Sequence, residues 1–277
     1  MPFAEIRGRQ IYYEIHGQGP TVVLLHHGFS SLNMWKGVYP ALVEAGYRVV
    51  LYDRRGYGRS ERGPDFEDFY LSGTFCQENC QDLKQLSHEL NLGRFHMVGQ
   101  CEGGVIAVHY AADFPDQVVS ITTSSTLCYS HVTMAEFNAA KFPKAFHELD
   151  AQVRDKLLLW IGEEHAESLY EMARTKGGAY GSDKFDIRPL LPLVQCPALV
   201  LYPDRSALFE VEQAVTFYRS LKNGELAVLP KCGHNTYDQQ PELYIRHVLD
   251  FLNRVTYENA NLMDFSMTCL APSPPQR

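Results

Sequence analysis

Short apolar runs rich in β-branched residues alternate along most of this chain with longer segments of helical periodicity. The runs predict strands at residues 11–16, 21–26, 48–53, 95–98, 118–123, 197–202 and 225–229. Apolar residues spaced three and four apart predict helices at residues 34–45, 76–92, 105–114, 211–221 and 242–255. This alternation predicts the α/β class, with a mostly parallel central sheet and helices on both faces.

The alternation stops between residues 128 and 192. This segment has helical character and is rich in aromatic residues: Phe137, Phe142, Phe146, Trp160, Tyr170 and Tyr180. We interpret it as a helical lid over the carboxyl ends of the strands, where open α/β sheets bind ligands. Most of its aromatic side chains are expected to pack in the lid's own core. Residues 1–127 and 193–255 would then form the core, and the mostly polar residues 256–277 a loose tail.

The charge and cysteine content narrow the functional classes. A net charge of −8 argues against a nucleic acid or an anionic membrane as partner, because both require a basic face. No apolar run approaches the roughly 18 residues of a membrane span, and no signal peptide is visible at the N-terminus. Seven irregularly spaced cysteines indicate free thiols in a reducing compartment. We therefore expect a cytoplasmic protein with a small-molecule substrate, no cofactor and no metal; the sequence specifies no oligomeric state.

The most informative motif is Gly-Gln-Cys-Glu-Gly-Gly at residues 99–104, between a predicted strand and a predicted helix. Strand, G-x-nucleophile-x-G turn and helix together form the context of a nucleophile elbow, in which glycines permit the sharp turn. The central residue is Cys101, whose thiol is a good nucleophile when a neighbouring imidazole takes its proton. We expect the N-terminus of the following helix to lower the pKa of this thiol.

Four motifs in order make residues 4–254 resemble the α/β-hydrolase superfamily. Residues 26–29 (His-His-Gly-Phe) resemble its oxyanion turn, and residues 53–60 (Asp-Arg-Arg-Gly-Tyr-Gly-Arg-Ser) its D-x-R-G-x-G-x-S turn. The third motif is the elbow at residues 99–104, and the fourth is Cys-Gly-His at residues 232–234, which resembles the catalytic-histidine loop. In carrying a cysteine at the elbow, the chain resembles dienelactone hydrolases and polyhydroxyalkanoate synthases. This second resemblance is confined to the elbow. The resemblance implies the α/β-hydrolase fold.

The resemblance also implies roles for individual residues. His234 would be the base and later the acid, and would form a thiolate–imidazolium pair with Cys101. The backbone N–H groups of Phe29 and Glu102 would form the oxyanion hole. We expect the Glu102 side chain to face solvent at the helix N-terminus, where the dipole favours a negative charge. Asp53 and Arg55 are expected to hold loops together.

The catalytic acid is where the chain departs from the family pattern. Residues 202–209 align with G-D-R-D-P-L-F, and this alignment places Ser206 where the catalytic aspartate belongs. Asp204 lies two residues earlier, and the alternative acid position shows two serines at 124–125.

Two arrangements of the third group remain open. Asp204 reaches His234 through a shifted loop, or Cys101 and His234 form a dyad whose imidazole is oriented by Ser206 or by a carbonyl. The dyad is chemically coherent, because a thiol is close to imidazole in pKa and needs less support from an acid than a serine hydroxyl does.

These residues predict a hydrolase that cleaves an ester, lactone or thioester through an acyl-cysteine intermediate. One alternative is an acyltransferase, in which an alcohol or thiol intercepts the acyl-cysteine. Another is a cofactor-free lyase or cyclase, in which His234 takes a proton and the oxyanion hole holds an enolate. A third, from another class, is a non-catalytic receptor whose lid closes on a ligand; it predicts binding without turnover.

Overall fold

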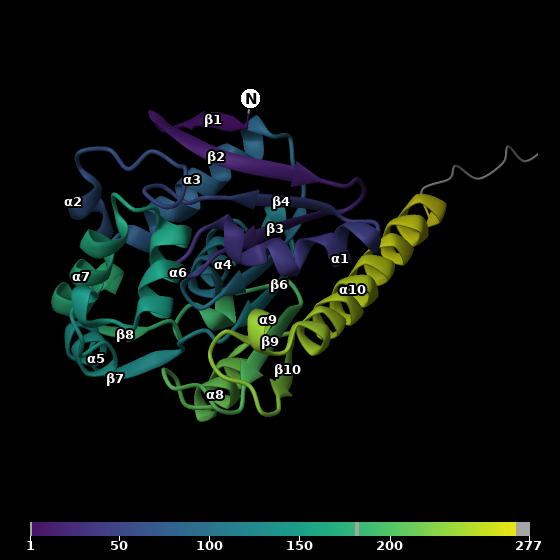
Figure 1. Ribbon diagram of the computed structural model, residues 1–277. Coiled ribbons are helices and arrows are strands. Elements are labelled where there is room, and N and C mark those ends of the chain that lie inside the picture. Colours follow the sequence, from purple (N-terminus) through teal and green to yellow (C-terminus); the bar gives the residue numbers. More distant parts are fainter. Residues whose placement is uncertain (1, 181–182, 270–277) are drawn as a thin grey trace, which may run out of the picture.

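The computed structural model describes residues 2–180 and 183–269, and its centre is an eight-stranded sheet (Figure 1). The strand order is β1-β2-β4-β3-β5-β6-β9-β10. The strands run over β1 Phe3–Ile6, β2 Arg9–His16, β3 Thr21–Leu25, β4 Arg48–Tyr52, β5 Phe95–Gln100, β6 Val118–Ser124, β9 Ala198–Pro203 and β10 Gly224–Leu229. The β1–β2 and β2–β4 pairs are antiparallel and the other pairs are parallel, so the predicted α/β class is confirmed.

Helices cover both faces of the sheet, so its central strands are buried on both sides and carry apolar residues on both. In β3, Val22 and Leu24 face a core shared with α1 (Tyr39–Glu44) and α10 (Pro241–Cys269). Val23 and Leu25 face the opposite core, which contains residues of the remaining covering helices: α3 Phe75–Glu89, α4 Glu102–Asp113 and α8 Glu212–Ser220. Both cores depend on the nearly continuous apolar runs that predicted the strands.

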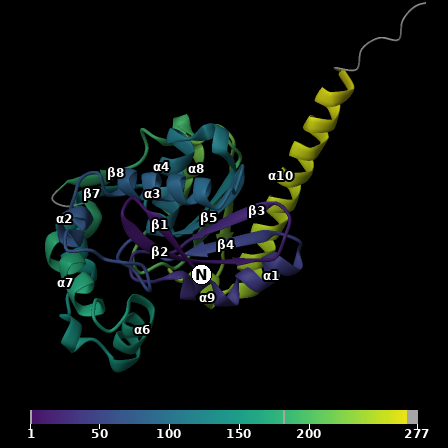
Figure 2. The same cartoon turned by 90° about the horizontal axis from the view of Figure 1, so that it is seen from above.

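Between β6 and β9 the chain leaves the sheet. It forms the helices α5 (Met134–Lys141), α6 (Ala151–Ile161) and α7 (Ala166–Lys176). It also forms an antiparallel ladder of β7 (Tyr129–Thr133) and β8 (Lys184–Asp186), which the helical interpretation of this segment missed. The helices α6 and α7 lie on the same side of the molecule as this ladder in both views (Figures 1 and 2).

Other elements differ from the sequence-based expectation for local reasons. The predicted helix at residues 34–45 is split into a 3-10 helix, Leu32–Gly37, and α1, because Pro40 in the first turn of α1 lacks an N–H. The short helix α2 (Phe66–Tyr70) was not predicted. Helix α10 continues to Cys269 and extends away from the sheet, so residues 256–269 of the expected tail are helical (Figure 1).

The extension of α10 has a simple cause in the sequence: no glycine or proline occurs between Pro241 and Pro272. The last part of the expected tail, residues 270–277, lies outside the described residues. Within the described part of the chain, no helix combines the length and the apolar character needed to span a bilayer.

Helix α4 lies close against the sheet because its first turn contains Gly103. A Cβ at this position would clash with the Leu25 backbone carbonyl at the end of β3. The small residue therefore sets the distance between the helix and the strand that carries the oxyanion turn.

Gly103→Ala should consequently destabilise the protein by about 1–3 kcal/mol, the usual cost of overpacking a core. Urea unfolding would measure this change in the free energy of unfolding. Gly37→Ala is the matched control, because a Cβ at Gly37 meets no atom within 4 Å. Equal stability of the two variants would contradict the packing argument.

Candidate active site

Cys101 occupies the turn between β5 and α4 with a backbone conformation that few residues adopt. Its φ is 53° and its ψ is −116°, a region that costs a non-glycine residue about 1–3 kcal/mol. The Cys101 amide donates to the Ser124 carbonyl at 2.8 Å, and a Cβ at Gly99 would clash with the Gly103 carbonyl. The turn is therefore held from the sheet on one side and from the helix on the other.

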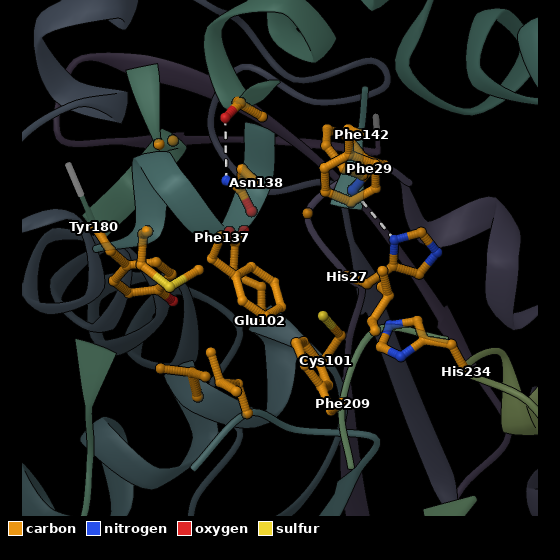
Figure 3. A pocket seen from close by; sticks show the side chains of 18 of the residues that line it. His27, Phe29, Cys101, Glu102, Phe137, Asn138, Phe142, Tyr180, Phe209 and His234 are labelled. Carbon is orange, nitrogen blue, oxygen red and sulfur yellow. Dashed lines mark hydrogen bonds between the residues drawn. The ribbon is translucent and has the colours of Figure 1, made fainter. Parts of the chain in front are cut away.

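The Cys101 side chain faces a cavity of about 520 Å³, which His234 also lines (Figure 3). The opposite wall comes from the segment between β6 and β9. Five of its aromatic residues line the cavity rather than packing in a separate core: Phe137, Phe142, Trp160, Tyr180 and Phe185. Phe146 and Tyr170 are buried outside the cavity wall, as expected. The wall is mostly apolar and suits a small organic ligand.

His234 lies in the loop that follows β10, and its ring is fixed from one side. Its Nδ1 is 3.4 Å from the Ser206 hydroxyl oxygen, and its ring packs edge-on against Phe209 at 5.2 Å between centroids. The same hydroxyl oxygen accepts the backbone N–H of Leu208 and of Phe209, at 3.2 Å each. Burial lowers the pKa of His234 to about 4, so the imidazole is neutral at pH 7.

A buried polar network anchors the backbone of His234 to the ends of β5 and β6. The His234 carbonyl accepts from the Gln100 side-chain amide at 2.8 Å and from the Ser125 hydroxyl at 2.7 Å. Thr236 extends the network, with its hydroxyl 2.6 Å from that of Ser124 and 3.1 Å from the Gln100 carbonyl oxygen. The sequence analysis did not predict this polar network. Its signal in the sequence was a cluster of polar residues at the ends of two predicted strands.

Asp204 occupies a different position from the one a triad acid requires. Its carboxylate accepts the backbone N–H of Cys232 at 2.9 Å and pairs with Arg205 at 3.4 Å. These contacts with the histidine loop lower its pKa, and its side chain is 29% exposed. Among the residues that the structure describes, the polar group in contact with the ring of His234 is Ser206.

The Glu102 side chain does not face solvent, so that expectation is wrong. It is 11% exposed, it lines the cavity, and its Oε1 lies 2.7 Å from Nη2 of Arg54. Arg54 is only 1% exposed, and a buried guanidinium requires a counter-charge. The attraction between these two groups outweighs the preference of a carboxylate for water.

The Cys101 thiol is less acidic than the helix N-terminus alone would make it. Burial, followed by the nearby charge of Glu102, raises its pKa to about 12, although the Glu102 backbone N–H favours the thiolate. The expected net lowering is therefore wrong. At neutral pH the thiol and the His234 imidazole are both uncharged, so the resting site is not the expected thiolate–imidazolium pair.

One of the two expected oxyanion donors already has an acceptor. The Phe29 N–H donates to Nδ1 of His27 at 3.1 Å, the dashed contact beside these two residues in Figure 3. His27 also has its Nε2 3.4 Å from the Tyr237 hydroxyl, and burial holds its pKa well below the ordinary value. An oxyanion bound at the expected position would therefore compete with His27 for the Phe29 amide.

The remaining residues considered in the sequence analysis are Asp53, possible metal ligands and the other cysteines. Asp53 accepts the backbone N–H of Leu32 at 2.7 Å and of Arg59 at 2.9 Å, so it ties loops together as expected. In the described part of the chain, no group of three or more His, Cys, Asp or Glu side chains is placed to hold a metal ion. The free cysteines other than Cys101 are buried or partly buried: Cys76, Cys80, Cys128, Cys196 and Cys232. The side chain of Cys269 lies outside the described set.

Known proteins are similar to this chain in sequence over most of its length. The chain is 27% identical to a fluoroacetate dehalogenase from a Burkholderia species over 282 residues, 86% of this chain and 89% of that protein. It is 26% identical to 2-hydroxy-6-oxononadienedioate/2-hydroxy-6-oxononatrienedioate hydrolase 1 of Dechloromonas aromatica over 268 residues, 88% and 90% of the two chains.

Solved structures show the same fold. The enol-lactonase from Burkholderia xenovorans aligns with a TM-score of 0.73 at 21% identity, over 91% of this chain and all of that one. The family described as the alpha/beta hydrolase fold matches residues 20–176, which is more than half of the sequence. With its sheet order, its elbow and this match, the chain belongs to the α/β-hydrolase family.

Proposed function

We propose that this protein is a cysteine hydrolase that cleaves an ester, lactone or thioester of a small molecule. The observation that carries the proposal is the strained elbow of Cys101, which directs a thiol into the cavity that His234 also lines. Strain of this kind persists where function requires it and the surrounding structure enforces it. In this proposal residues 128–192 act as a lid over the site, and Ser206 orients the His234 ring.

The reaction proceeds in two balanced steps. The Cys101 sulfur attacks the substrate carbonyl carbon while Nε2 of His234 takes the thiol proton; this step uses the tautomer that keeps the ring's own proton on Nδ1, 3.4 Å from the Ser206 hydroxyl oxygen. His234 then gives this proton to the leaving oxygen or sulfur as its bond to carbon breaks. In the second step a water molecule transfers a proton to His234 as its oxygen bonds to the acyl carbon. The carbon–sulfur bond breaks and the proton returns to Cys101.

The uncharged resting site determines how the first step occurs. With the thiol pKa at about 12 and the imidazole pKa at about 4, proton transfer before attack is unfavourable. The proton therefore moves as the carbon–sulfur bond forms, which is general-base catalysis. The backbone N–H groups of Phe29 and Glu102 stabilise the developing oxyanion. Esters, lactones and thioesters suit this site because their leaving groups demand less of the acid than an amine does.

Cys101→Ala should abolish turnover of p-nitrophenyl butyrate and keep the fold, because the replacement side chain is also small. Intact-mass spectrometry of the wild-type protein during turnover should show the butyryl adduct, with peptide mapping placing it on Cys101. Cys196→Ala, at a partly buried free cysteine outside the cavity, is the control and should keep full activity. Turnover by the Cys101→Ala variant would refute the proposal.

Asp204→Asn should lower kcat/KM by less than about tenfold, because Asp204 contacts the backbone of the histidine loop. The same change in a serine-protease triad costs about 10⁴. Ser206→Ala should cost more than Asp204→Asn, because it removes the group that orients the ring. Steady-state kinetics with melting temperatures would measure both effects. A loss of several hundredfold from Asp204→Asn at unchanged stability would make Asp204 the triad acid.

The pH profile should report the low pKa of His234. The base must be unprotonated, so kcat/KM should stay high as the pH is lowered and decrease only as it falls through about 4. An unperturbed imidazole would place this decrease near pH 6.5. Initial rates in constant-ionic-strength buffers, with the stability of the protein checked at each pH, would measure the midpoint. A midpoint at the ordinary imidazole value would contradict the neutral resting site.

A further inference from the structure

We propose that Glu102, together with Tyr70 and Tyr180, forms a subsite that binds an ammonium group on the acyl part of the substrate. Glu102 brings a carboxylate to a cavity whose wall is otherwise mostly apolar. The substrate class in this statement rests on the proposed function, whereas the binding of the ammonium group does not.

The two carboxylate oxygens of Glu102 have different surroundings. Oε1 pairs with Arg54 at 2.7 Å and lies 3.5 Å from the Tyr57 hydroxyl. Oε2 lies toward the oxyanion turn, where a Cβ built on Gly28 would be 3.0 Å from it. Oε1 therefore pairs with Nη2 of the buried guanidinium, and Oε2, the nearer of the two oxygens to the Gly28 position, lies beside a turn that lines the cavity.

Arg54 holds the Glu102 carboxylate in one position. The guanidinium is 1% exposed and stacks over the Tyr57 ring at 4.6 Å. It is not part of the cavity wall, so a ligand meets the carboxylate and not the guanidinium. Because this ion pair holds the side chain in one position, little conformational entropy is lost when a ligand binds to Oε2.

Two tyrosines complete the polar end of the cavity. Tyr70 and Tyr180 both line it, and burial, followed by nearby charges that include that of Glu102, raises the pKa of both phenols. Aromatic rings attract cations, and both hydroxyls stay protonated at neutral pH. Tyr180 is further held by a contact of 3.6 Å between its hydroxyl and the Cys76 sulfur.

The position of the subsite defines the substrate class. Glu102 directly follows Cys101, and its carboxylate lies beside the oxyanion turn, so the bound ammonium group must be close to the carbonyl carbon under attack. This geometry favours an amino-acyl ester, lactone or thioester. It disfavours a second carboxylate beside Glu102, because the two like charges would repel each other. Lys156, a cation on the cavity wall, is already paired with Asp238 at 3.1 Å.

The first test compares three six-carbon ligands that differ only in their head group and do not react with the protein. Isothermal titration calorimetry with the wild-type protein should show hexylamine binding at least tenfold more tightly than 1-hexanol or hexanoate. This comparison requires no variant to fold, and it does not depend on Cys101 as the nucleophile. Equal or tighter binding of hexanol or hexanoate, or no binding of hexylamine at millimolar concentration, would overturn the subsite.

The second test removes the negative charge of the Glu102 side chain. Glu102→Gln keeps an acceptor for Arg54 and should weaken hexylamine binding at least tenfold while hexanol binding stays nearly unchanged. Glu14→Gln is the matched control, because Glu14 also pairs with an arginine, Arg59 at 3.0 Å, but does not line the cavity. An unchanged preference of the Glu102→Gln variant for hexylamine would refute the assignment. If the amine preference holds while Cys101→Ala retains turnover, the subsite stands and the proposed function fails.

Discussion

The positive φ of Cys101 is the constraint on which the rest of the site depends. The turn places a side chain above the end of the sheet only because β5 stops at Gln100 and α4 begins at Glu102. Glycine at position 103 lets the helix approach the sheet closely enough to hold this geometry. The same turn brings the Glu102 amide to the Cys101 sulfur and places Glu102 where its carboxylate meets Arg54.

The electrostatics of the site are set by burial more than by the helix dipole. A thiol and an imidazole in an apolar cavity both favour their neutral forms, and the fixed charge of Glu102 adds to this effect at Cys101. The ring of His234 is held by a hydroxyl, while Gln100 and Ser125 hold its backbone. Orientation is thus supplied by neutral hydrogen-bonding groups where the family pattern has an aspartate, which is consistent with a neutral resting site.

Much of the fold was predictable because its signals are local. An apolar run such as residues 21–26 predicts a buried strand. The elbow motif at residues 99–104 predicts a strand before the turn and a helix after it. The boundary errors have local explanations as well. Pro40 divides a predicted helix, and the absence of a helix breaker after Pro241 extends α10 through residues expected to be a tail.

The sequence by itself determined the α/β class, the position of Cys101 at the elbow and its pairing with His234 as a hypothesis, because spacing and residue type carry this information. Tertiary structure alone decided which groups surround them. Glu102 faces the cavity because it meets Arg54, and Ser206 rather than Asp204 meets the ring because of how the loop after β9 folds. The pKa values of the thiol and the imidazole follow from burial among side chains distant in sequence, and no local pattern records that burial.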